Sequence, residues 1–179
     1  MSRVITFSRS FPAYHPKKGE PTHFVEGILN TMAAILPSDY YSFLKLNSGN
    51  EKLAETLFST ITENITLFNK SHTIRAGHRW KVGEKFSPRV WSGKPYKSPM
   101  ITIAPDIEIK KVWDFKIEGE VFRMRRTDRP DYNWFILGYH DLKIIAANDG
   151  LSIENLYAWF QYPKPFDGQI ICWNGSINY

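Results

Sequence analysis

Residues 70–97 combine basic and aromatic side chains in a pattern suited to binding a nucleotide or single-stranded nucleic acid. This stretch contains eight Lys or Arg residues and a single acidic residue, Glu84. The basic residues are Lys70, Arg75, Arg79, Lys81, Lys85, Arg89, Lys94 and Lys97, and the aromatic residues between them are Trp80, Phe86, Trp91 and Tyr96. Cationic side chains attract phosphate, and aromatic faces stack on exposed bases. The competing interpretation is a basic sheet surface whose aromatic side chains point into the core.

The basic residues are concentrated in the middle of the chain. The whole chain of 179 residues has a net charge of +5. Residues 1–66 are neutral overall, residues 67–130 hold fifteen basic and seven acidic side chains, and residues 131–179 hold two basic and five acidic ones. The charge pattern therefore favours an anionic partner that binds the middle of the chain.

Several familiar catalytic and metal-binding patterns are absent from the sequence. It contains no Gly-rich phosphate loop, no GxGxxG, no GxSxG and no HExxH. Its five His residues are scattered, and Cys172 is its one cysteine, which excludes an intramolecular disulfide and a cysteine-based metal cluster. We therefore expect neither a metal nor a cofactor.

Composition predicts a soluble, cytoplasmic protein that forms one domain over residues 1–179. Hydrophobic residues make up 42% of the chain and aromatic residues 15%, which is ample material for a core. No apolar run approaches the ~20 residues that a membrane helix needs, and the N-terminal residues lack the apolar stretch of a secretory signal. We expect no membrane partner, and the sequence leaves the oligomeric state open.

The N-terminal third reads as helical after one short strand. Val4 to Ser8 is a β-type segment, and from Pro21 to near Pro37 apolar residues follow a helical spacing. Ser38-Asp39 is placed to cap a helix over Tyr40 to Leu46, and Glu51 to Leu67 predicts a third helix.

The rest of the chain is predominantly of β character. The predicted strands are Thr73 to Arg75, Lys85 to Trp91, Met100 to Ala104, Ile107 to Phe115, Val121 to Met124, Trp134 to Leu137 and Gln169 to Trp173. Two helices, Asp141 to Ala147 and Ser152 to Phe160, precede the last strand. Many short strands with few helices predict an α+β, mainly β fold, a small β-barrel with flanking helices.

One segment carries a resemblance to a known family. Lys70-Ser71-His72-Thr73-Ile74-Arg75, followed by the turn Val82-Gly83-Glu84, is similar to the signature of the ASCH family of PUA-like β-barrels. The strand at Val4 and the helix from Pro21 fit the same pattern, as does an acidic residue, Asp149, shortly before a helix. The smallest members of the family pass almost directly from the first helix to the segment that corresponds to Lys70. Here about residues 31–67 intervene as an N-terminal helical insertion, which would serve either as extra packing or as a lid.

The resemblance implies recognition of a cytidine-like nucleoside or RNA, and in the hydrolytic members removal of the acetyl group from N4-acetylcytidine. It implies Thr73 as nucleophile, Lys70 as its activating base and Asp149 as the carboxylate that aids proton transfer. A lysine acts as a base near neutral pH only if burial or nearby cations lower its pKa. The hydrolytic members carry Glu where this chain has Asp149, so the carboxylate here is one methylene shorter.

The remaining candidate residues would bind the ligand rather than react with it. These are Arg75, Arg79, Trp80, Lys81, Lys85, Arg89 and Trp91. Arg75 has two interpretations, as a ligand for a carbonyl or phosphate or as the partner of a carboxylate such as Asp149. Trp80 and Trp91 suit either a stacking cleft or the core. The alternative function is a non-catalytic RNA-binding module, or a ribonuclease, that uses the basic surface 70–97.

Overall fold

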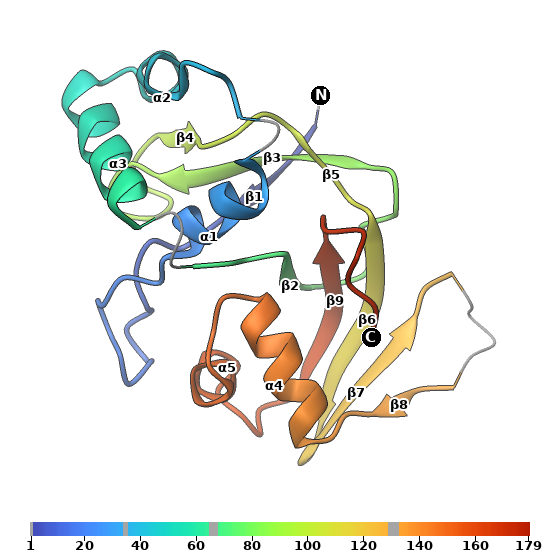
Figure 1. Cartoon of the computed structure of the whole chain (residues 1–179). Helices are drawn as coiled ribbons and strands as arrows, with labels where there is room; N and C mark the ends of the chain where they lie inside the picture. The colour runs from blue at the N-terminus through green and yellow to red at the C-terminus, as the bar shows by residue number, and fades with distance from the viewer. Residues whose placement is uncertain (1, 34–35, 65–67, 129–132) are drawn as a thin grey trace.

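The protein is an α+β molecule with equal shares of helix and strand, 28% each. The computed structural model describes residues 2–33, 36–64, 68–128 and 133–179. Within these residues five helices accompany two open sheets, one of four strands and one of five. Figure 1 shows the two sheets one above the other, each with helices beside it. The α+β class is confirmed, while the predicted predominance of strand over helix is not what the structure shows.

The smaller sheet is built around one long strand. Strand β3 pairs in parallel with β1 and antiparallel with β4 and β5. The bounds of these strands are β1 (Arg3–Thr6), β3 (Lys85–Trp91), β4 (Met100–Thr102) and β5 (Ile107–Glu108). Phe86 and Val90 of β3 lie four residues apart, on one face, and both are fully buried. Pairing with β1 therefore fixes the N-terminal strand beside the middle of the chain.

The larger sheet is antiparallel throughout and places β2 at one edge. Its order is β2-β9-β6-β7-β8. The bounds are β2 (His72–Ala76), β6 (Lys111–Glu118), β7 (Val121–Arg126), β8 (Phe135–Ile136) and β9 (Phe166–Cys172). Helices α4 (Tyr139–Asn148) and α5 (Ile153–Trp159) lie beside this sheet in Figure 1. Leu142, Ile145 and Leu156 bury their side chains there.

Three helices follow β1 in the N-terminal part of the chain, as predicted. They are α1 (Phe24–Thr31), α2 (Tyr40–Ser48) and α3 (Glu51–Asn64). The carboxylate of Asp39 accepts a hydrogen bond from the Ser42 amide and caps α2 as predicted. Helix α2 packs against α3 and against β4. Helix α1 is shorter than predicted, and the predicted extension of α3 through residues 65–67 lies outside the described residues.

One predicted strand was wrong. The segment expected to be continuous from Ile107 to Phe115 is divided between the two sheets, because β5 pairs with β3 whereas β6 pairs with β9. At the break, Ile109 exchanges backbone hydrogen bonds with Gly83 and Glu84. An unbroken apolar run carries no sign of which sheet each part joins, so the change of partner was not visible in the sequence.

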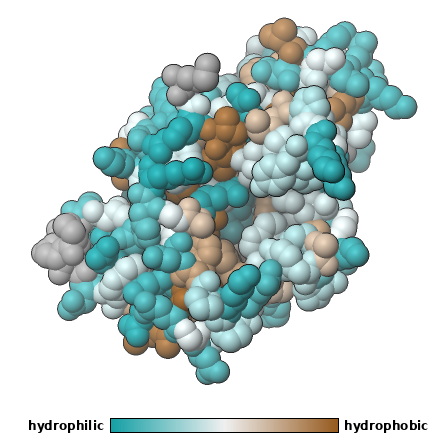
Figure 2. Space-filling model, turned by 180° about the vertical axis from the view of Figure 1, so that it is seen from behind, coloured by the Kyte–Doolittle hydropathy of each residue, from teal (hydrophilic) through white to brown (hydrophobic). Residues whose placement is uncertain are grey.

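No helix in the described part of the chain has the length and apolar character needed to cross a membrane. On the face seen in Figure 2, hydrophilic residues cover much of the surface and hydrophobic ones gather toward its middle. The core extends through both sheets and reaches α1, α3, α4 and α5.

Candidate active site

Lys70 is buried at the point where the chain enters β2. Its side chain is 1% exposed. The Lys70 amide donates to the carbonyl of Gly27 over 3.1 Å, and the Thr31 hydroxyl lies 2.8 Å from the Lys70 carbonyl oxygen. The next amide, that of Ser71, donates to Asn148 over 2.8 Å. The backbone around Lys70 is therefore fixed between α1 and the end of α4.

The Lys70 ammonium contacts a carboxylate that lies 79 residues away in the sequence. Nζ donates to Asp149 Oδ1 over 2.6 Å and to the Asp149 carbonyl oxygen over 2.5 Å. Nζ also lies 4.0 Å from the centre of the Phe24 ring. Asp149 follows directly after α4, so the end of this helix delivers the carboxylate. The shorter side chain of Asp149 thus reaches Lys70 without difficulty.

Burial alters the ionisation of both partners. Loss of hydration lowers the pKa of Lys70 to about 8; Asp149 opposes this change, and the positive charge of Arg75 adds to it. Burial likewise raises the pKa of the Asp149 carboxyl, against the opposing effect of the Lys70 ammonium. The site therefore holds an amine that loses its proton far more easily than an ordinary lysine.

Thr73 and Arg75 lie on the same cavity as this ion pair. The cavity has a volume of about 210 Å³. Its lining includes Thr6, Phe7, Ser8, Phe24, Lys70, Thr73, Ile74, Arg75, Trp91, Pro95, Tyr96, Asp149, Trp159 and Phe160. Arg75 donates from Nη2 to the carbonyl of Thr6 over 2.7 Å, and its Nε has no hydrogen-bond partner among the described residues. All four of the polar residues singled out by the sequence thus meet in one place.

A second buried layer lies behind Asp149. His72 Nε2 is 3.8 Å from Asp149 Oδ1, and its Nδ1 lies 2.8 Å from the hydroxyl of Tyr179. That hydroxyl also accepts a hydrogen bond from the Asn148 side chain over 2.9 Å. Burial and the nearby Lys70 hold the pKa of His72 well below its ordinary value, so its ring is neutral. Sequence reasoning missed this layer, since His72 showed only as an isolated histidine.

Five of the predicted ligand-binding residues do not line this cavity. They are Arg79, Trp80, Lys81, Lys85 and Arg89. Arg79, Lys81 and Lys85 are exposed elsewhere, and Arg89 is half-buried on β3.

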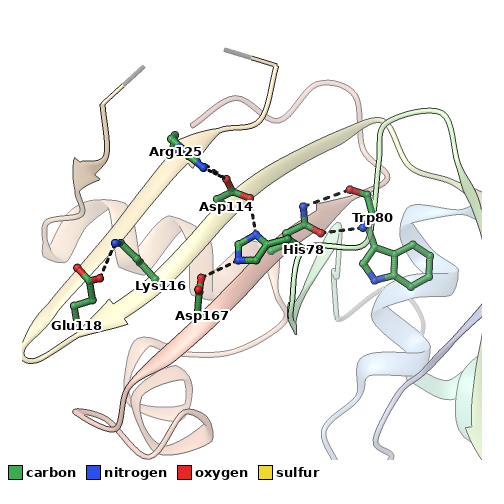
Figure 3. Close-up of polar contacts among 8 residues, drawn as sticks. His78, Trp80, Asp114, Lys116, Glu118, Arg125 and Asp167 are labelled. Carbon is green, nitrogen blue, oxygen red and sulfur yellow. Dashed lines mark hydrogen bonds and ion pairs between the residues drawn. The ribbon is translucent and has the colours of Figure 1, made fainter. Parts of the chain in front are cut away.

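Trp80 is a core residue, which is the second of the two interpretations left open for it, and it does not bind at this cavity. It is 2% exposed, and its ring packs edge-on against Phe86 with Arg3 over its face at 4.5 Å. Its backbone amide and carbonyl both bond the side-chain amide of Gln169. These bonds fix the loop after β2 against β9 (Figure 3).

His78 anchors the same loop. Its two ring nitrogens each lie 2.9 Å from a carboxylate, those of Asp114 on β6 and Asp167 on β9. Figure 3 shows the imidazole between the two acids, with Arg125 on the far side of Asp114. The loop carrying Arg79 and Lys81 is thereby held at the end of β2 that lies away from Lys70.

Trp91 does line the cavity, together with aromatic residues that the sequence did not single out as binding residues. Its ring lies 5.2 Å from that of Tyr96, which is 88% exposed and has a left-handed backbone (φ 62°). Trp159 and Phe160 come from the end of α5. No local spacing links α5 to the basic stretch, so only the fold brings these rings together.

Within the described part of the chain, no group of three or more His, Cys, Asp or Glu side chains is arranged to hold a metal ion. Comparison of the chain with protein-family models, with curated proteins and with solved structures finds no match.

Proposed function

We propose that this protein is an ASCH-type member of the PUA-like class that hydrolyses the amide bond of N4-acylcytidines. In this proposal the two sheets are the parts of a small β-barrel. One observation carries the functional proposal: a fully buried lysine, with a pKa near 8 and paired with Asp149, lies on the same cavity as Thr73. The proposal rests on the geometry together with the sequence resemblance around Lys70.

The first half of the reaction transfers the acyl group to the protein. Neutral Lys70 takes the proton of the Thr73 hydroxyl, and the Thr73 oxygen attacks the carbonyl carbon of the amide. The tetrahedral intermediate then collapses, the bond from carbon to N4 breaks, and the Lys70–Asp149 pair returns the proton to N4. Cytidine leaves with a free amino group, and the acyl group stays on Thr73 as an ester.

The second half restores the free protein. Water attacks the ester as Lys70 accepts one of its protons, and the Thr73 oxygen leaves with that proton. The products are the carboxylic acid and intact Thr73, so one amide and one water give one amine and one acid. Arg75 lines the same cavity, and its positive charge would stabilise negative charge that develops on the carbonyl oxygen.

The aromatic lining provides a place for the base. Trp91, Tyr96 and Trp159 all border the cavity that holds Lys70. A planar cytosine gains stacking energy against such rings whatever its sequence context.

The test is incubation of the purified protein with N4-acetylcytidine, with cytidine release followed by chromatography. We expect release by the wild type and loss of release in Lys70→Ala and Thr73→Ala. Thr73→Ser keeps the hydroxyl and should retain activity, whereas Thr73→Val keeps the shape and should not. Lys81→Ala, an exposed residue off the cavity, is the matched control.

No release by a well-folded wild type, or release that survives Thr73→Val, would contradict the proposal. Thermal unfolding of each variant separates a lost reaction from a lost fold.

A second candidate, RNA binding without catalysis, is favoured by the surface at the cavity mouth. Tyr96, exposed and strained, stands between Lys94 and Lys97, which are also exposed. Such a module should lose affinity for single-stranded RNA steeply as salt rises, through counterion release, and should tolerate Thr73→Ala. Lys70→Ala and Thr73→Ala therefore separate the two candidates.

A further inference from the structure

A second cavity lies directly beside the first. Its volume is about 330 Å³. Five lining residues are common to both cavities: Phe7, Ser8, Phe24, Trp91 and Pro95. Phe24, whose ring lies 4.0 Å from the Lys70 ammonium, therefore borders both spaces.

The far wall of the second cavity belongs to the helical insertion. Thr56, Leu57 and Ile61 of α3 line it, and Val25 of α1 adds a further aliphatic side chain. Leu57 and Ile61 are 6% and 1% exposed, so their positions are fixed by the core. The second cavity thus gains three aliphatic side chains from α1 and α3, beside the polar Ser8, Ser10 and Thr56, whereas the first cavity has none of these helix residues and more aromatic ones.

The charged residues of the second cavity do not require a charged ligand. Glu26 is buried, and its carboxylate lies 3.4 Å from Nδ1 of the His23 imidazole without a hydrogen bond between them. Arg9 is exposed. An uncharged, apolar group can contact Leu57, Ile61 and Phe24 without displacing Glu26 or Arg9.

We propose that this second cavity binds the acyl group of the substrate and that the protein prefers acyl chains longer than acetyl. This inference rests on the proposed function. An amide at Lys70 and Thr73 has a base on one side and an acyl chain on the other, and the aromatic cavity suits the planar base. The aliphatic cavity is left for the chain. Its volume is roughly ten times that of a methyl group, taken as about the 30 Å³ of one water.

The proposal assigns a role to the helical insertion. By closing the second cavity with Leu57 and Ile61, α3 makes the site selective for chain length without touching the reacting atoms. Leu57 and Ile61 would act as specificity-determining residues, and Lys70 and Thr73 would act equally on all acyl groups.

The experiment compares kcat/KM for N4-acetylcytidine and N4-hexanoylcytidine. Because burial of one methylene improves binding by about fourfold, we expect the hexanoyl compound to exceed the acetyl compound by at least about tenfold. Leu57→Phe narrows the cavity and should reduce this preference. Thr56→Trp fills the same space from an exposed position and spares the core. Leu53→Phe, on the same helix but off the cavity, is the matched control and should keep the preference.

The outcomes separate the two proposals. Lys70-dependent hydrolysis of the acetyl compound without a hexanoyl preference overturns this inference and leaves the proposed function standing. A hexanoyl preference that stays undiminished in both Leu57→Phe and Thr56→Trp also overturns it. If neither compound is hydrolysed, the proposed function fails, and the inference fails with it.

Discussion

The pH dependence of amide hydrolysis should follow the ionisation of Lys70. Its pKa lies at about 8 instead of 10.5. At pH 7 roughly one molecule in ten then carries the neutral amine, against roughly one in 3,000 for an unperturbed lysine. This gain of about 300-fold in available base corresponds to about 3 kcal/mol. We therefore expect kcat/KM to rise about tenfold from pH 6 to pH 7 and to level off above about pH 8.

Two substitutions should move the inflection of this profile in opposite directions. Asp149 holds the pKa of Lys70 up and Arg75 pushes it down. Asp149→Asn should therefore shift the inflection to lower pH and Arg75→Met to higher pH, whatever each does to the maximal rate. Initial rates of cytidine release between about pH 6 and pH 9.5 give the profile, and NMR titration of the lysine ¹⁵Nζ resonances gives the pKa without any substrate.

A flat profile, an inflection near pH 10, or a shift of both variants in the same direction would refute this reasoning. Stability offers an independent check of the sign. Because the folded pKa lies below the unfolded one, the unfolded chain binds more protons between about pH 8 and pH 10.5. This group should make the free energy of unfolding rise with pH across that window.

Three further predictions concern stability and positioning. Lys70→Met and Asp149→Leu should each destabilise the fold by about 3–5 kcal/mol in urea titrations, because each leaves one buried charge without its partner. The double variant leaves no buried charge and should recover most of this loss. Strictly additive losses would contradict the pairing. Burial lowers the pKa of His78, but its hydrogen bonds to Asp114 and Asp167 outweigh burial and raise the pKa. The wild type should therefore melt at a higher temperature than His78→Asn below about pH 6.5, and this difference should fade as pH rises. A difference that is constant with pH would contradict the prediction. Gly27→Ala would place a Cβ 3.0 Å from the backbone nitrogen of Lys70. It should reduce kcat/KM by up to about 100-fold, with a smaller effect on melting temperature. Unchanged kinetics would show that the backbone at Lys70 can shift to make room.

The part of the site that lies close together in the sequence was predictable, and so was its main long-range partner. Thr73 and Arg75 lie two apart in a strand and share a face, so alternation alone brings them together. Lys70 lies two residues before the strand, where the Ser71 amide donates to the Asn148 carbonyl. Asp149 was located through the family resemblance, from its place shortly before a helix, rather than by any physical rule.

The aromatic residues show where sequence reasoning ended. Trp80 and Trp91 occur in the same basic stretch, yet one is enclosed by the core and the other lines the cavity. Which side of a strand or loop faces a cavity depends on elements packed from elsewhere, here β9 through Gln169 and α5 through Trp159. The aliphatic wall from α3 was unpredictable for the same reason.

The hydrogen bonds between the two ends of the helical insertion have a consequence for how such a protein can evolve. The Asn30 side chain donates to the Phe68 carbonyl over 3.0 Å and to Asn69 Oδ1 over 2.8 Å, and Thr31 contacts the Lys70 carbonyl. The chain therefore leaves and re-enters the rest of the protein at a single point. A shorter segment at this point would cost less loop-closure entropy, but it must still cover the core surface that Leu44, Leu57 and Ile61 bury. In the function proposed above, exchange of this segment for another that covers the same core surface would change the range of acyl groups while Lys70 and Thr73 stay the same.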